Sequence, residues 1–198
     1  MKERAAWSPT PDKMTHAIGR DVTLWPVVPE ARQAEPHWDD APLPDYQAMM
    51  AREPGEPEPD FSMSRELLEV IARQGLFFDA FPLTLMTTRS IASIAAASPD
   101  SRIDVRRFRP NILIETDERG SFPEQDWIGQ EIRIGDALLK VHSTCIRCVM
   151  TTHGFADLSK DPRIMRALVK QAGGNLGVYA TVEKPGRIAR GDSLLRRD

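Results

Sequence analysis

Hydrophobic side chains recur with two different periods over residues 61–198, and each period predicts a different kind of element. Apolar and polar residues alternate over residues 81–88, where Phe81, Leu83 and Leu85 share one face, so the pattern predicts a strand. Other segments have the spacing of an amphipathic helix. The predicted helices cover residues 64–73, with Ser64 as the cap and Gly75 at the end, residues 90–97, and residues 161–171, which stop at Gly173-Gly174.

The remaining strands are short and are separated by turn residues. Residues 105–116 predict a strand that is kinked or lies at a sheet edge, because Pro110 interrupts it. Residues 131–141 predict two strands around Gly135-Asp136, and residues 178–195 predict three strands separated by turns at 185–186 and 190–192. Many short strands with few helices favour a β-rich α+β fold of barrel type over alternating βαβ units.

Proline separates the first 60 residues from this pattern. Ten of the 16 prolines lie there, and proline removes a backbone donor and fixes φ, so regular structure cannot dominate this part. A short strand at residues 22–25 and a short helix at residues 44–50 are compatible with it. Residues 52–60 are typical of an exposed acidic linker. We therefore expect a proline-rich extension and linker over residues 1–60 and a domain over residues 61–198.

Composition narrows the functional classes. With 198 residues and 41% hydrophobic content, the chain can bury one good core. A formal net charge of -3 argues against sequence-independent nucleic-acid binding. The sequence contains no apolar run of signal-peptide or membrane-spanning type, and its two cysteines are too few for a disulfide framework. These features predict a cytoplasmic protein that binds neither nucleic acid nor membrane.

The stretch from His142 to His153 concentrates the residues with metal and redox chemistry. It contains both cysteines, Cys145 and Cys148, with Arg147 between them. Thiolates are ligands for soft metals, and an arginine beside Cys148 favours the thiolate. The two histidines and two cysteines also have a zinc-like spacing, and a redox Cys-x-x-Cys pair is a further alternative. Either cysteine can instead be a small buried hydrophobic residue.

Several short motifs occur together in a familiar order. They are Phe-Asp-Ala-Phe-Pro-Leu at 78–83, Arg-Phe-Arg-Pro-Asn-Ile at 107–112, Trp-Ile-Gly at 127–129 with Ile-Gly-Asp at 134–136, Thr-Cys-Ile-Arg-Cys-Val-Met-Thr-Thr at 144–152, and Gly-Arg-Ile-Ala-Arg-Gly-Asp at 186–192. Over about residues 65–197 the chain resembles the MOSC family, named for the C-terminal domain of molybdenum cofactor sulfurase. That family includes the mitochondrial amidoxime-reducing component.

The resemblance implies a β-barrel-type domain that binds the molybdenum cofactor. Cys148 falls at the family's molybdenum ligand, and Arg109 and Asn111 fall at positions that contact the pterin or its phosphate. Arg147 is expected to help position the cofactor or neutralise its charge. Thr88 and Ser90 are candidates both for helix capping and for cofactor contact. Arg109 has an alternative role as a surface arginine that packs on Phe108. Residues 25–30 stand where amidoxime-reducing relatives carry a Pro-Val-Lys-Ser type segment, and here they contain neither lysine nor serine.

The resemblance also implies a reaction. We expect an oxidoreductase that reduces N-oxygenated small molecules, with electrons from a separate partner protein, because the sequence has no flavin, haem or iron–sulfur motif. The absence of the Lys-Ser segment favours a second hypothesis, a non-catalytic cofactor carrier or sulfur-transfer module. A degenerate fold that serves as an interaction module is a third.

The two cysteines should differ in their surroundings. If residues 141–149 run largely as a strand, Cys145 and Cys148 face opposite sides of the sheet, because they are an odd number of positions apart. The resemblance assigns the cofactor side to Cys148.

Overall fold

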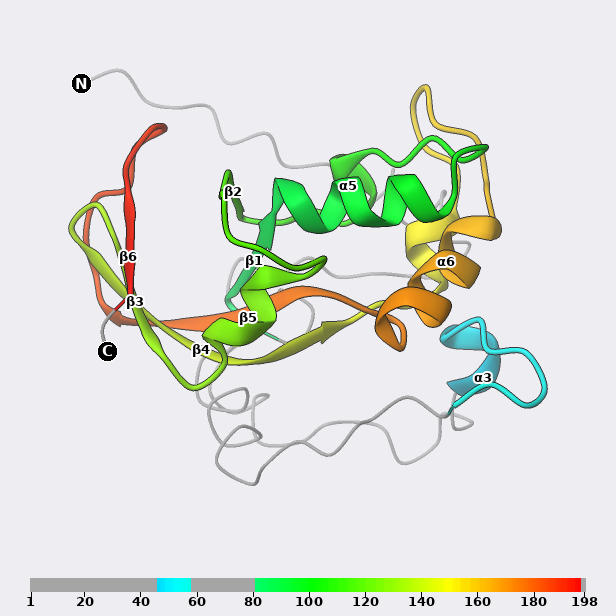
Figure 1. Cartoon of the computed structure of the whole chain (residues 1–198), viewed down its shortest axis with the longest axis horizontal. Coiled ribbons are helices and arrows are strands. Elements are labelled where there is room, and N and C mark those ends of the chain that lie inside the picture. The colour runs from blue at the N-terminus through cyan, green and yellow to red at the C-terminus, as the bar shows by residue number, and fades with distance from the viewer. Residues whose placement is uncertain (1–45, 58–80, 197–198) are drawn as a thin grey trace, which may run out of the picture. The chain divides into compact units, whose positions relative to one another are not determined.

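The computed structural model describes residues 46–57 and 81–196, which all belong to one compact unit of the chain, Pro42–Asp198 (Figure 1). The strand predicted at 22–25, the helix predicted at 64–73 and the segment at 25–30 lie outside the described residues. The boundary expected between residues 60 and 61 also lies in the undescribed stretch, and it stays a prediction.

A single curled sheet forms the centre of the described domain. Its strand order is β2-β1-β5-β4-β3-β6, and neighbouring strands are antiparallel except for the parallel pair β1 and β2. The strands are β1 (Leu83–Thr87), β2 (Ile112–Ile114), β3 (Glu131–Ile134), β4 (Ala137–Ile146), β5 (Asn175–Lys184) and β6 (Leu194–Arg196). The sheet forms a half-barrel, so the predicted β-rich α+β fold of barrel type is confirmed.

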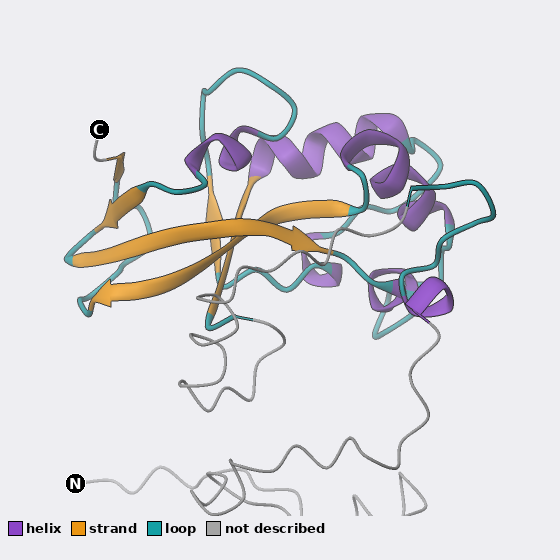
Figure 2. Ribbon diagram, turned by 90° about the horizontal axis from the view of Figure 1, so that it is seen from below, coloured by secondary structure: helices purple, strands orange, loops and turns teal. Residues whose placement is uncertain are grey.

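Two hydrophobic clusters lie on opposite faces of this sheet. The neighbouring residues Leu85 and Met86 on β1 point to different faces, as the pleat of a strand requires. Leu85 belongs to a cluster built on β3, β4 and β5 around Trp127, which is fully buried. Met86 belongs to a cluster with the apolar faces of α5 (Thr88–Ala97) and α6 (Arg163–Ala172), and Figure 2 shows the longer helices along one face of the sheet.

The helix boundaries follow from local capping. Thr87 ends β1 and caps α5, because its side chain accepts a hydrogen bond from the backbone N–H of Ser90 in the first turn of the helix. Gly173 ends α6 in the left-handed conformation with φ of 60°. The predicted helices at 90–97 and 161–171 are therefore confirmed, with small shifts at their ends.

A short segment far away in sequence packs at the end of α6. It contains α3 (Tyr46–Met49), which confirms the short helix predicted at 44–50. Arg52 donates from Nη2 to the carbonyl oxygen of Gly173 at 2.8 Å, and Glu56 pairs with Arg166 at 2.6 Å. Part of the sequence predicted to be an exposed linker is thus held against the domain by polar contacts.

One strand prediction was wrong, and another was confirmed only for its part after Pro110, which forms the edge strand β2. Residues Val105–Arg107 form a 3-10 helix, because the Asp104 carboxylate accepts from the backbone N–H of Arg106 and caps the turn. Only Ile112–Ile114 of the predicted 105–116 strand pairs in the sheet. The strand predicted after Gly186 does not form either, because this turn packs on the backbone of Asp136 and Ala137, where a Cβ would lie 2.3–2.5 Å from backbone atoms.

Candidate functional site

Cys148 lies just beyond the end of β4, at the start of a tight turn. It is the N-cap residue of the 3-10 helix η3 (Val149–Thr152) and is partly exposed. The Cys148 thiol makes no hydrogen bond or ion pair with any of the described residues 46–57 and 81–196. The structure therefore leaves this sulfur available to a ligand.

Cys145 has different surroundings. It is 2% exposed and packs in a small cluster with Phe81 and Tyr179. The two cysteines differ, as predicted, but strand parity is not the reason. β4 ends at Ile146 and has register shifts between Val141 and Ser143 and between Thr144 and Ile146.

The zinc and disulfide alternatives can be compared with these positions. Cys145 and Cys148 form no disulfide with each other. His142 donates to or accepts from Thr181 at 2.8 Å and lies 5.6 Å from the Phe81 ring, and burial lowers the pKa of this histidine. Within the described residues, no three histidine, cysteine, aspartate or glutamate side chains form a metal-binding group. The predicted zinc ligands are therefore not brought together.

Arg109 occupies an unusual backbone conformation in the turn before β2. Its φ is 50°, in the left-handed region that is unfavourable for a residue with a Cβ. Asn111 fixes the following residues, because its side chain accepts from the Thr84 N–H at 2.8 Å and its own N–H donates to the Thr84 carbonyl at 2.9 Å. The exposed Arg109 guanidinium makes no polar contact with the described part of the chain.

Arg147 connects the two motifs directly. Its side chain is 8% exposed, and its Nε and Nη2 atoms donate to the Leu176 carbonyl at 2.8 and 2.6 Å. Its Nη1 atom donates to the Phe108 carbonyl at 2.9 Å, and its guanidinium lies 5.8 Å from the Phe108 ring centre. The residue before Cys148 thus holds the residue before Arg109.

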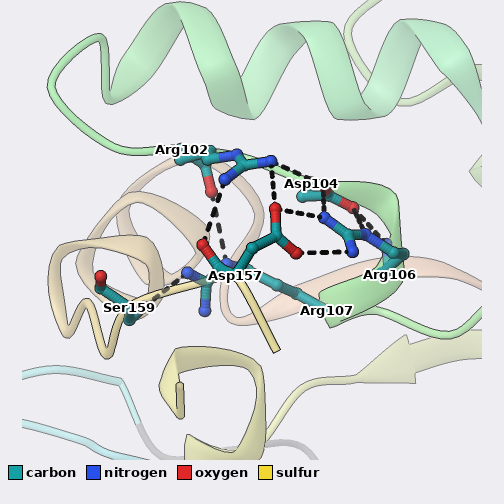
Figure 3. Close-up of polar contacts among 6 residues, drawn as sticks. All are labelled: Arg102, Asp104, Arg106, Arg107, Asp157 and Ser159. Atoms are coloured by element: carbon teal, nitrogen blue, oxygen red, sulfur yellow. Dashed lines mark hydrogen bonds and ion pairs between the residues drawn. The ribbon is translucent and has the colours of Figure 1, made fainter. Parts of the chain in front are cut away.

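Arg107 connects the same two motifs from the other side, and it was not among the site residues predicted from the sequence. The side chain is 6% exposed. It donates to the carbonyl oxygens of His153 at 3.0 Å and Thr151 at 3.4 Å. It also donates to the carbonyl oxygen of Ser159 at 2.6 Å (Figure 3). A residue of the Arg109 motif therefore holds the turn that follows Cys148.

Next to Arg107 lies an exposed group of ion pairs, which also appears in Figure 3. Arg106 pairs with Asp104 at 2.7 Å and with Asp157 at 2.9 Å, and Arg102 pairs with Asp157 at 2.7 Å. Hydrogen bonds from Arg106 lower the pKa of Asp104 to about 2 and lower that of Asp157 further. These ion pairs link the segment that contains Arg107 to the segment after Cys148, as Arg107 does, but they lie at the solvent-exposed surface.

The beginning of α5 separates the two remaining candidates. Thr88 is exposed and lines an open pocket of about 380 Å³ with Arg89, Ala92 and Thr116. Ser90 is fully buried, and both Thr87 and Ser90 donate to Oε2 of Glu124, at 2.7 and 2.5 Å. Glu124 is itself fully buried, and its Oε1 atom has no hydrogen-bond partner among the residues that the structure describes.

Comparison with known proteins assigns the family. The sequence profile of the MOSC domain matches residues 72–195, well over half of the chain. The chain belongs to the MOSC domain family. The family resemblance read from the motifs is thereby confirmed, and all the candidate residues discussed here lie inside the matched region.

The chain is similar to curated MOSC proteins over part of their length. It is 31% identical over 132 residues to mitochondrial amidoxime reducing component 2 of Rattus norvegicus, covering 60% of this chain and 37% of that protein. It is 30% identical over 135 residues to mitochondrial amidoxime-reducing component 1 of Mus musculus, covering 61% and 38%. The chain thus spans less than two fifths of the length of these relatives.

A solved structure also matches. YiiM from Geobacillus stearothermophilus aligns with a TM-score of 0.43 and 16% identity, over 59% of this chain and 54% of that chain.

Two side chains of this MOSC domain, those of Cys148 and Arg109, are chemically suited to bind a sulfur-ligated metal that carries a phosphorylated organic group. A thiolate is a good ligand for a soft or high-valent metal, and a guanidinium matches a phosphate through paired donors. Cys148 and Arg109 supply these two groups, and neither is used by the described fold. The residues present therefore fit the cofactor that the family resemblance implies.

Proposed function

We propose that this MOSC-domain protein is a molybdenum-cofactor-binding oxidoreductase that reduces N-oxygenated small molecules. The observation that carries the proposal is the partly exposed Cys148 thiol, free of protein partners among the described residues, within the matched region. The names of the amidoxime-reducing relatives support the choice of substrate class. The bound cofactor would supply two-electron oxygen-transfer chemistry.

Each proposed residue has a separate task. Cys148 would ligate the metal through its thiolate. Arg109 would bind the cofactor phosphate, and Asn111, which fixes the Arg109 turn through its hydrogen bonds with Thr84, would contact the pterin or its phosphate. Thr88 would offer its hydroxyl at the beginning of α5, and Ser90 would support this turn through Glu124. Arg147 would position the two cofactor-binding turns through its hydrogen bond to the Phe108 carbonyl.

The reaction needs electrons, and we propose that a separate donor protein supplies them. No helix among the described residues has the length and apolar character needed to cross a membrane. The cytoplasmic location expected from the sequence stays a prediction.

Metal analysis of the purified chain tests the proposal. The full chain would be produced in a host that makes the molybdenum cofactor, and its molybdenum content measured by mass spectrometry. We expect Cys148→Ser to abolish metal retention with the fold intact. The matched control is Cys145→Ser, which should keep the metal and lower the free energy of unfolding by about 1–2 kcal/mol. Wild-type protein that contains no molybdenum, and gains none on reconstitution, would refute the proposal.

The accessibility of the Cys148 thiol also supports a second candidate, a sulfur-transfer or cofactor-carrier module. In this case Cys148 would carry a persulfide. Intact-mass measurement would detect the added sulfur, and a reductant would remove it. Efficient reduction of hydroxylamine-type compounds with an artificial electron donor would exclude this role as the main one.

A further inference from the structure

Two buried arginines tie together the two segments that carry the proposed ligands. Arg147 precedes Cys148 in sequence and donates to the carbonyl of Phe108, which precedes Arg109. Arg107 lies in the Arg109 segment and donates to carbonyls of Thr151 and His153, which follow Cys148. The two side chains therefore cross between the same segments in opposite directions.

The donors of both side chains are directed at the backbone and not at carboxylates. Neither arginine forms an ion pair with any carboxylate in the described part of the chain. A guanidinium has five N–H donors in a rigid plane, so it can fix carbonyls from separate segments at once, whereas a lysine ammonium cannot reproduce this geometry.

The strained turn at Arg109 needs such support. A left-handed φ at an arginine persists only when the surrounding structure determines it. Arg147 holds the carbonyl before Arg109, and Thr84 holds the backbone N–H of Asn111 after it. The backbone of Arg109 is thus fixed on both sides while its own guanidinium remains unengaged.

We infer that Arg107 and Arg147 are positioning residues that hold the Arg109 turn and the Cys148 turn in one fixed relative placement. This inference rests on the proposed function only for what the two turns bind. Buried arginines of this kind would set the distance between the thiolate and the phosphate-binding guanidinium before any ligand arrives, which reduces the ordering cost of binding.

Hydrogen exchange on the full chain tests this inference without any cofactor. We call the carbonyl contacts of Arg107 and Arg147 between the two turns the arginine brace, or the brace. Arg107→Lys keeps the positive charge but loses the planar set of guanidinium N–H donors. We expect backbone exchange to become about tenfold faster in peptides covering residues 146–155, which lie on the far side of the brace, as well as in residues 105–112. Peptides of the β3–β4 hairpin should be unchanged. The matched control is Arg106→Lys at the neighbouring exposed position, which should leave residues 146–155 unchanged.

A second control separates positioning from general stability. Leu139→Ala truncates a fully buried side chain in the other hydrophobic cluster and should lower the melting temperature without touching the brace. In a cofactor-producing host, Arg107→Lys should lower the molybdenum content per protein about tenfold, as mutations of supporting residues do, while Leu139→Ala should lower it far less.

The outcomes are distinct. Faster exchange spread evenly over the chain, or an equal loss of molybdenum in Leu139→Ala at a similar melting temperature, would overturn the inference. If Arg107→Lys does not fold, Arg147→Lys is measured in the same way, and unchanged exchange at residues 105–112 would overturn it. If the wild-type protein contains no molybdenum, the proposed function fails, and the exchange measurement still decides the brace.

Discussion

Two groups of arginines lie side by side in this domain and use their charge in opposite ways. Arg107 and Arg147 are 6% and 8% exposed and bind backbone carbonyls. The side chains of Arg102 and Arg106 are 59% and 45% exposed and bind carboxylates. An exposed ion pair is screened by water and salt, while a buried donor that loses its acceptor leaves polar groups unsatisfied. We therefore expect Arg107 and Arg147 to contribute more to the free energy of unfolding than Arg102 and Arg106 do, although only the exposed pair of arginines forms ion pairs.

The largest effect should come from Arg147→Met, which keeps an unbranched apolar stem and removes every donor. The carbonyls of Leu176 and Phe108 lose buried partners, so we expect the free energy of unfolding to fall by about 3 kcal/mol. Urea denaturation measures it, with Arg106→Met as the matched control. A loss no larger than that of the control would break the comparison.

Glu124 extends the comparison to a buried acid that is held by neutral hydroxyl groups. Glu124→Ala removes the acceptor of Thr87 and Ser90 and leaves a cavity, so a destabilisation of about 2–3 kcal/mol is expected. Glu124→Gln keeps the shape and one acceptor oxygen and should cost clearly less. Equal losses in thermal unfolding of the two variants would show that neither the side-chain shape nor the retained acceptor oxygen contributes, and would contradict this account.

Acid should act on the exposed group first. Hydrogen bonds from Arg106 lower the pKa of Asp104 from 3.8 to about 2. A lowered pKa contributes stability above the unfolded value, and that contribution disappears as the pH falls through the folded value. Stability should therefore decline between about pH 4 and pH 2, and Asp104→Asn should flatten part of this decline. An unchanged acid profile in Asp104→Asn would remove the exposed group from the account.

The smallest effect should come from Arg106→Met. Its ion pairs are exposed to solvent, so the free energy of unfolding should fall less than in the other variants, and about 1 M salt should remove most of the difference from wild type. Denaturation at two salt concentrations measures this. A large, salt-independent loss would mean that Arg106 also supports the buried group.

The sequence predicted correctly those elements that depend on residues close together in the chain. Alternation located β1 and the β3–β4 hairpin, and Gly173 marked the end of α6, because each depends on neighbouring residues. The segment with Cys148 was also found, since both cysteines lie there. Residues 105–107 were misassigned as a strand because an aspartate cap outweighed the apolar pattern.

Arg107 and Glu124 could not be found in this way. Glu124 meets its partners 34 and 37 positions away, and Arg107 meets His153 46 positions away, so no local spacing marks either residue. Nothing in the Arg-Arg-Phe-Arg run distinguishes the buried Arg107 from the exposed Arg106 until the 3-10 turn fixes their directions. The only sequence signal was the unusual density of arginine beside the Arg-Pro-Asn motif.

The position of β5 determines when this sheet can assemble. β5 lies between β1 and β4, yet it is the next-to-last of the described strands in sequence, and its partner β1 is the first of them. The β3–β4 hairpin can close early, because its strands are adjacent in sequence. Among the described strands, β1 gains its antiparallel partner only when α6 and β5 have been made, so closure of a very long loop must precede this pairing. During synthesis, the apolar faces of β1 and α5 would therefore stay uncovered until β5 has been made, so the sheet is completed late in the folding of this domain.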